Sequence, residues 1–85
     1  MKEIEIGIVD HFFSHLSVVG IQVTEGTIKI GDTLHFIGHT TNFEEKVTAM
    51  QKEHLSVKEA RSGDAIGMPV QQKARKHDKV FKVVS

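Results

Sequence analysis

The 85-residue sequence contains no cysteine and a single proline, Pro69. Without cysteine there is no disulfide, no thiolate metal site and no cysteine nucleophile, which fits a reducing compartment. No apolar run approaches the ~20 residues of a membrane-spanning helix, and residues 1–6 alternate polar and apolar as a strand does, unlike a targeting segment. We therefore expect a cytoplasmic protein without a membrane partner.

A phosphate-binding loop is also missing. The motif Gly-x-x-x-x-Gly-Lys-Ser/Thr does not occur, so we expect no GTP binding by this chain. No other cofactor is predicted from its residues. At this length the chain has material for one core, and we expect residues 1–85 to form a single domain.

Turn signals are the most informative residues that are present. Apolar, β-branched runs stop at glycines, which reach positive φ without the penalty of a Cβ atom. At Gly31-Asp32 and Gly63-Asp64 the glycine can take the left-handed position while the aspartate side chain accepts hydrogen bonds from nearby amides. The predicted structural turn residues are Gly26, Gly31, Asp32, Gly63 and Asp64.

Alternating apolar residues between these turns predict β-strands. The expected strands cover approximately residues 3–11, 16–24, 34–38, 43–54, 66–70 and 80–84. Gly20 is expected to form a bulge or barrel corner, and Pro69, which lacks an N–H donor, is expected at a rim or bulge. Residues 55–62 are expected to include one helical turn.

Four of these elements together resemble a known family. Residues 26–34 read Gly-Thr-Ile-Lys-Ile-Gly-Asp-Thr-Leu, followed by Val47-x-x-Met50, and residues 60–67 read Ala-Arg-Ser-Gly-Asp-Ala-Ile-Gly. A fourth element is formed by residues 76–78. The order of these four elements is similar to that in the second domain of translational GTPases such as elongation factor Tu, where the last element is usually Arg-Gly-Asp. The resemblance covers residues 5–84 approximately and implies an all-β fold, a small closed six-stranded Greek-key barrel.

The loop between the first two strands departs from the family pattern. The family commonly has Gly-Arg-Gly-Thr there. This chain has His15-Leu16-Ser17-Val18, which contains neither the arginine nor either of the glycines. The resemblance therefore carries over the fold and the turn residues, and no tRNA-contact residue.

Charge is distributed unevenly along the chain. Residues 1–45 hold two lysines against seven acidic residues, and residues 46–85 hold nine basic against four acidic residues. The candidate binding residues of the basic second half are Lys73, Arg75, Lys76 and Lys79. Such a cluster can attract phosphates or an acidic protein surface. The preferred alternative is a solvated lysine-rich turn and edge strand, since nucleic-acid modules usually show a larger positive charge.

The pair Phe12-Phe13 beside His15 is a second candidate binding site. Consecutive residues of a strand point in opposite directions, so one ring is expected in the core and the other exposed, where it could stack a base or anchor a protein. In the alternative, the bend tucks both rings inward.

The histidines and one hydroxyl-containing trio bring metal binding and hydrolysis into question. The histidine pairs 11/15 and 35/39 are four residues apart, which on a strand is roughly 13 Å, too far to share one ion. We therefore predict no metal site. The trio Asp10, Ser14 and His15 lacks the aimed base and the oxyanion hole of a hydrolase, and we predict no enzymatic activity.

The leading hypothesis is a non-catalytic binding module that contacts the ribosome, RNA or a translation-associated protein. The alternative hypothesis is an accessory protein-interaction subunit or homodimer that is associated with an enzyme and unrelated to translation. A third interpretation, metal binding through the histidines, would require stability that depends on zinc.

Overall fold

The computed structural model describes residues 2–84, and all regular structure in that range is β-strand. The strands are β1 Lys2–Phe13, β2 Val18–Val23, β3 Thr27–Lys29, β4 Thr33–Ile37, β5 Asn42–Lys46, β6 Gln51–Lys52, β7 Leu55–Ser56, β8 Glu59–Arg61, β9 Ala65–Pro69 and β10 Lys79–Val84. The all-β prediction is confirmed. Among these residues no helix is long and apolar enough to cross a bilayer.

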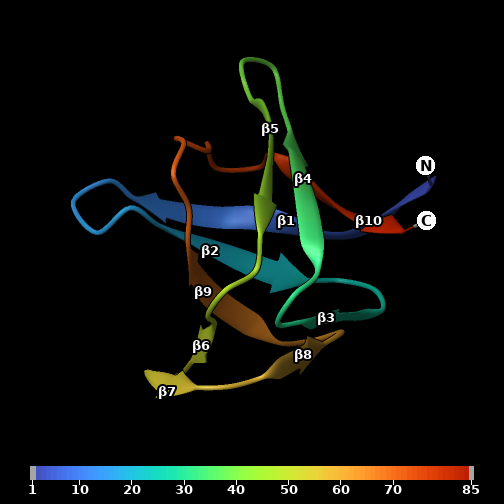
Figure 1. The fold of residues 1–85 in the computed structure, drawn as a ribbon. Helices are drawn as coiled ribbons and strands as arrows, with labels where there is room; N and C mark the ends of the chain where they lie inside the picture. Colours follow the sequence, from blue (N-terminus) through green and yellow to red (C-terminus); the bar gives the residue numbers. More distant parts are fainter. Residues whose placement is uncertain (1, 85) are drawn as a thin grey trace.

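Eight strands form one antiparallel sheet in the order β5-β4-β10-β1-β2-β9-β6-β7, and β3 pairs separately with β8. In Figure 1 the β4–β5 hairpin stands across the long β1–β2 hairpin, and the β3–β8 ribbon lies beneath them. The two ends of the described chain are neighbours, since Lys2 is the register partner of Val84.

The predicted six-stranded closed barrel is not confirmed in this form. The six longer strands (β1, β2, β4, β5, β9 and β10) match the expected segments, but the sheet has eight strands and no described pairing joins β5 to β9. The long strand expected over residues 43–54 is broken into β5 and β6 by the irregular stretch 47–50.

One local prediction is wrong, and a second is corrected in part. Residues 55–62 contain β7 and β8 instead of a helical turn, because short pairings with β6 and β3 satisfy their backbone. The irregularity near Gly20 is a bulge in β1 and not in β2. Val9 pairs with Ile21 and His11 pairs with Gly20, so Asp10 is an additional residue of β1 without a register partner on β2. An additional residue in one strand bends it and raises the local twist.

The core lies between the crossed hairpins. Phe36 of β4 and Phe43 of β5 stack with ring centroids 4.9 Å apart at an interplanar angle of 15°. Opposite them, β2 turns Val19, Ile21 and Val23 inward, and all three are fully buried. The alternation places Val18, Gly20 and Gln22 of β2 on the outer face.

Three turns share one hydrogen-bonding pattern. The Oδ2 atoms of Asp32, Asp64 and Asp78 accept the N–H of the residue three positions earlier, at 2.8, 2.9 and 2.8 Å. The residue before each aspartate has positive φ, 98° at Gly31, 97° at Gly63 and 76° at His77. Gly26, with φ of 68°, turns the chain between β2 and β3.

Candidate functional site

The two phenylalanines of β1 lie on different sides of the sheet. Phe12 packs against the core, whereas Phe13 is 45% exposed and its ring meets the imidazole of His11 edge to face at 4.5 Å. His15 is exposed in the turn that follows. In the same turn Leu16 is 70% exposed, a large apolar side chain that the sequence did not single out as a site.

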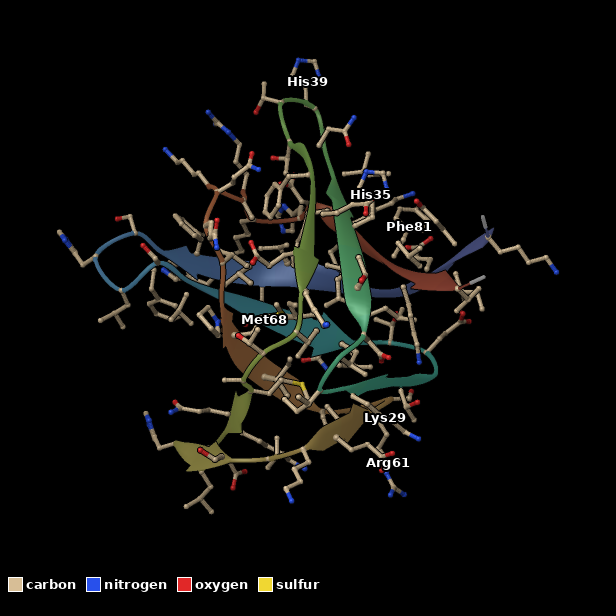
Figure 2. The ribbon with its side chains drawn as sticks, in the orientation of Figure 1. Lys29, His35, His39, Arg61, Met68 and Phe81 are labelled. Atoms are coloured by element: carbon tan, nitrogen blue, oxygen red, sulfur yellow. The ribbon has the colours of Figure 1, made fainter. Side chains whose placement is uncertain are left out.

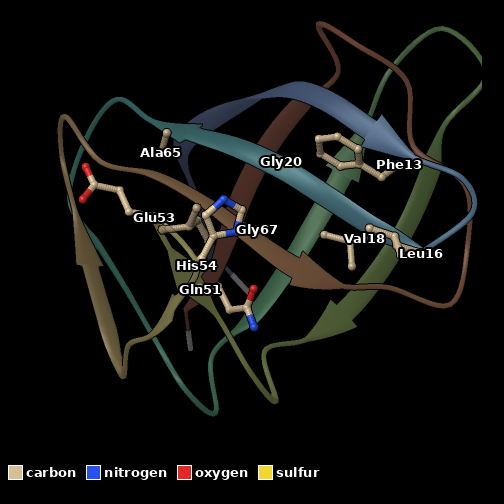
Figure 3. A pocket seen from close by; sticks show the side chains of 10 residues that line it. Phe13, Leu16, Val18, Gly20, Gln51, Glu53, His54, Ala65 and Gly67 are labelled. Carbon is tan, nitrogen blue, oxygen red and sulfur yellow. The ribbon is translucent and has the colours of Figure 1, made fainter.

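Beside Phe13 and Leu16 the outer face of the molecule is hollowed (Figure 3). We call this hollow, of about 370 Å³, the hairpin pocket. It lies between the tip of the β1–β2 hairpin, the β6–β7 turn and the outer face of β2 and β9. Its lining residues are Phe13, Leu16, Val18, Gly20, Gln51, Glu53, His54, Ala65, Ile66 and Gly67.

A pair of glycines forms the floor of the hairpin pocket. Gly20 of β2 and Gly67 of β9 are direct register partners. A Cβ atom at either position would meet no neighbouring atom closer than 3.4 Å. Packing therefore does not require glycine here, and the hollow exists because two facing positions carry no side chain.

Both turns that border the hairpin pocket hold residues in the left-handed backbone region. Ser17 has φ of 54°, and the consecutive residues Glu53 and His54 have φ of 52° and 67°. For residues other than glycine this conformation costs on the order of 1 kcal/mol or more each, and such outliers gather at functional sites. In Figure 3 the His54 imidazole projects over the β9 floor of the hollow.

A second hollow of about 240 Å³ adjoins the first and shares Val18, Gln51 and Gly67 with it. Its further lining includes the apolar residues Ala49, Met50 and Met68. The two hollows together make a mainly apolar groove, and its lining includes the polar residues Gln51, Glu53 and His54. A groove of this kind accepts apolar side chains from an extended or irregular segment.

The predicted basic cluster lies elsewhere. Lys73, Arg75 and Lys76 are exposed in the loop between β9 and β10, and Lys79 is exposed at the start of β10. Within residues 2–84 none of these four side chains makes an ion pair. None of them lines the hairpin pocket.

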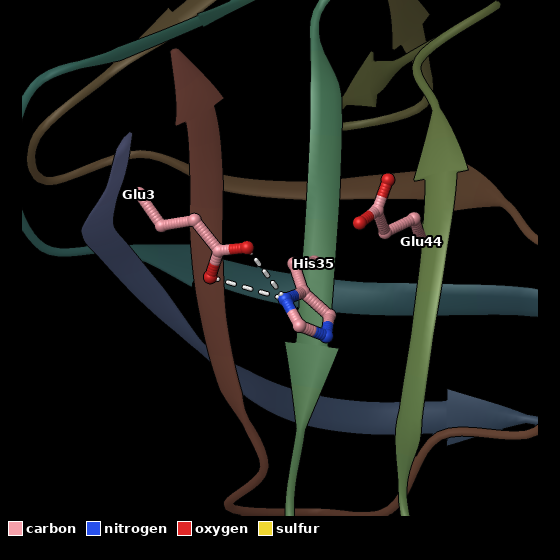
Figure 4. Close-up of side chains that lie close together, drawn as sticks. All are labelled: Glu3, His35 and Glu44. Carbon is pink, nitrogen blue, oxygen red and sulfur yellow. Dashed lines mark hydrogen bonds and ion pairs between the residues drawn. The ribbon is translucent and has the colours of Figure 1, made fainter. Parts of the chain in front are cut away.

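A different set of polar residues gathers on the outer face of β1, β4 and β5 (Figure 4). The His35 Nδ1 atom lies 3.0 and 2.8 Å from the two carboxylate oxygens of Glu3, and its Nε2 atom lies 2.6 Å from Asn42 Oδ1. The hydrogen bond to Asn42, together with the Glu3 carboxylate, raises the pKa of His35 above its ordinary value. Glu44 completes the cluster.

Local pattern could not have found this cluster. Glu3, His35 and Glu44 are distant in sequence, and the sequence pattern related His35 only to His39, which on a strand is too far away to share an ion with it. His39 lies at the tip of the β4–β5 hairpin, away from His35 (Figure 2). The other trio considered, Asp10, Ser14 and His15, is exposed and has no hydrogen bond among its members in the described part of the chain.

Comparison with curated proteins finds relatives named as proteases. Over 81 residues, 94% of this chain, the sequence is 38% identical to an uncharacterized protease of Methanocaldococcus jannaschii. Over 82 residues it is 32% identical to a collagenase of Porphyromonas gingivalis. The chain spans about a fifth of the length of these relatives, 20% in both cases.

Solved structures share the fold. The C-terminal domain of a protein from Geobacillus thermoleovorans, described as a U32 peptidase, matches 94% of this chain and 92% of its own with a TM-score of 0.87 at 17% identity. A selenomethionine variant of that domain matches 89% of this chain and 95% of its own, with a TM-score of 0.83 at 16% identity.

These relatives overturn the leading functional hypothesis. A module for the ribosome, RNA or a translation-associated protein is wrong, because the similar curated proteins are named as proteases. The physical reason is that the recognised residues are turn glycines and aspartates, which specify a backbone path. A backbone path does not specify a partner.

The family itself was identified correctly from those turns. The family model for elongation factor Tu domain 2 matches residues 17–80, about three quarters of the chain. The chain belongs to the elongation factor Tu domain 2 family.

Proposed function

We propose that this chain is an accessory, non-catalytic domain of a peptidase-type enzyme, which docks onto the catalytic region through the hairpin pocket. The observation that carries the proposal is the apolar hollow with a glycine floor between Gly20 and Gly67. Its occupant is an apolar side chain of the catalytic region. Protein interfaces commonly centre on one apolar side chain seated in a pocket.

The exposed apolar residues support a protein partner. Phe13 and Leu16 border the hollow, and Leu55, which follows the pocket residue His54, is 69% exposed. Two large exposed apolar side chains that line one hollow are costly to leave in water, and covering them would supply association free energy. Since the curated relatives are about five times longer than the matched region and are named as proteases, the remainder of such a protein is the partner proposed here.

A finer description of the fold belongs to the same proposal. β5 and β6 are the two halves of one segment, yet they lie near opposite ends of the sheet order, where β6 pairs with β9 through Gln51 and Gly67. Because residues 47–50 connect β5 at one end of the sheet to β6 beside β9, this connection would close the six longer strands into a Greek-key barrel. This closure would hold the β6–β7 turn against β9 and so shape the pocket.

The test is to titrate this domain with the catalytic region of the peptidase-type protein from the same organism. Isothermal titration calorimetry measures the binding affinity. Gly67→Val fills the hollow, and Leu16→Glu places a charge on its border. Both are expected to weaken binding at least tenfold. Valine suits a strand, and the room at Gly67 means that the melting temperature should change little.

Ile30→Glu is the matched control. Ile30 is 42% exposed but lies outside the hairpin pocket, so this variant should bind as the unchanged domain does. Equal weakening by all three variants would contradict the proposed surface. Absence of binding together with a concentration-dependent dimer in sedimentation would replace the proposed partner with a second copy of the chain.

A further inference from the structure

The cluster on the outer face of β1, β4 and β5 has the composition of a metal site. Glu3, His35 and Glu44 each offer one ligand atom, and these three atoms lie within 4.8 Å of one another. Two carboxylates and one imidazole are a donor set that Zn²⁺ accepts, at metal–ligand distances of roughly 2.0–2.2 Å. In Figure 4 the Glu3 and Glu44 carboxylates flank the His35 ring from its two sides.

The sheet register holds this arrangement in place. His35 and Glu44 are direct partners on β4 and β5, so their side chains leave the same face at neighbouring positions. β10 separates β4 from β1, and its residue Phe81 is the register partner of both His35 and Glu5. Glu3 lies two residues before Glu5, on the same face, and reaches across β10 to the imidazole.

The hydrogen bonds of His35 leave a position for a cation. An amide oxygen accepts hydrogen bonds and does not donate them, so the Nε2 atom that faces Asn42 Oδ1 at 2.6 Å carries the hydrogen. In the neutral ring Nδ1 then has a lone pair, and it faces the carboxylate oxygens of Glu3 at 2.8 and 3.0 Å. Two acceptors at this distance repel each other unless a proton or a metal ion lies between them.

We propose that Glu3, His35 and Glu44 bind one divalent transition-metal ion of the zinc type, through His35 Nδ1 and an oxygen of each carboxylate. Asn42 acts as the positioning residue, because its bond to Nε2–H selects the tautomer whose Nδ1 can bind a metal. Histidine ligands almost always have such a partner on the other ring nitrogen. The exposed fourth position is left to water, and the ion joins β1 to the β4–β5 hairpin across β10.

Calorimetric titration with ZnCl₂ after chelator treatment tests the site. We expect one ion per chain and a melting temperature that rises with zinc concentration, since a ligand of the folded state stabilises it. His35→Gln and Glu44→Gln should abolish both effects. His39→Gln, which alters a histidine at the nearby hairpin tip, should abolish neither.

A titration with Co²⁺ gives a second readout, because protein-bound cobalt absorbs visible light differently from the hydrated ion. Asn42→Ser keeps all three ligands and should lower affinity by about tenfold or more while the melting temperature in chelator is unchanged. Absence of zinc binding by the unchanged chain, or binding that survives His35→Gln, would overturn the proposal. The variants of the hairpin pocket should bind zinc normally, so this test is independent of the proposed docking function.

Discussion

At the scale of single residues, each of three turns combines an aspartate side chain with a residue of positive φ directly before it. Three turns use an aspartate that accepts an amide three residues back, and two of them have glycine before the aspartate. The third has His77 with φ of 76° at the equivalent position. Since His77 N–H also donates to the Val9 carbonyl at 2.8 Å, the surrounding structure holds the residue in this unfavourable conformation.

We expect His77→Gly to stabilise the domain. Removing the Cβ atom relieves a left-handed conformation that costs about 1–2 kcal/mol, while the greater freedom of glycine in the unfolded chain returns part of that gain. The net rise in the free energy of unfolding should be up to about 1 kcal/mol in urea denaturation. His39→Gly is the control: His39 is exposed without positive φ, and this change should lower stability by about 0.5–1 kcal/mol.

Close backbone approach makes a different glycine indispensable. A Cβ atom at Gly7 in β1 would lie 2.6 Å from the carbonyl oxygen of Gln22 in β2. We expect Gly7→Ala to lower the free energy of unfolding by about 1–3 kcal/mol, since two paired strands must separate locally. Gly67→Ala, for which the nearest atom is 3.4 Å away, should change it little. Equal losses in the two variants would disprove the close-contact explanation.

At the scale of the elements, one ion pair joins β6 to the turn before β9. Lys52 Nζ lies 2.7 Å from Asp64 Oδ1, and the other oxygen of Asp64 accepts the Arg61 amide at 2.9 Å. The hydrogen bond from Lys52 is the main cause that lowers the pKa of Asp64, and the same bond raises the pKa of Lys52. The pair thereby stabilises the border of the hairpin pocket.

This pair predicts a pH dependence of stability. Because the folded-state pKa of Asp64 is below its ordinary 3.8, its contribution is present above that value and is lost as the pH falls through the lowered pKa. The contribution of Lys52 is complete below its ordinary 10.5 and is lost as the pH rises through the raised pKa. We expect Asp64→Asn to melt earlier than the unchanged chain at about pH 7, with a difference that shrinks toward about pH 2.

Lys52→Met should produce the same early melting at neutral pH, and adding it to Asp64→Asn should produce no further loss. A melting difference that stays constant from neutral to acid pH would show that Asp64 acts through shape alone and would contradict the ion-pair explanation.

At the scale of the whole molecule, stability depends on contacts between the two crossed hairpins. Phe36 and Phe43 come from the β4–β5 hairpin, while Val19, Ile21 and Val23 come from β2 of the other hairpin, and all five side chains are buried. Such contacts join segments far apart in sequence, so the core forms only when the whole chain folds.

We expect Phe36→Ala to lower the free energy of unfolding by about 3–5 kcal/mol, which is a large share of the stability of a domain of this size. Phe13→Ala removes the same ring from an exposed position and should cost under about 1 kcal/mol, measured by urea denaturation. It should instead weaken docking at the hairpin pocket. Similar losses of stability in both variants would place Phe13 in the core and contradict the proposed surface.

Features that depend on neighbouring residues could be predicted from the order of the amino acids alone. Glycine-aspartate turns and β-branched alternation are local, and they sufficed to predict an all-β chain and its elongation factor Tu domain 2 family. They also sufficed for the six longer strands. The basic cluster after β9 is equally local, but charge density alone does not identify a partner, and the preferred interpretation of the cluster was a solvated turn and edge strand.

The tertiary structure decided what depends on sheet register. Register brought Gly20 opposite Gly67 to open a hollow, and it set Glu3 beside His35 although 32 positions separate them along the chain. It also divided the fourth expected strand into β5 and β6, which pair with different neighbours. Strand pairing is the sum of many contacts between distant segments, and no local pattern contains that sum. Of the hairpin pocket, the sequence had indicated only Phe13, and the remaining residues of the two candidate sites are brought together by folding.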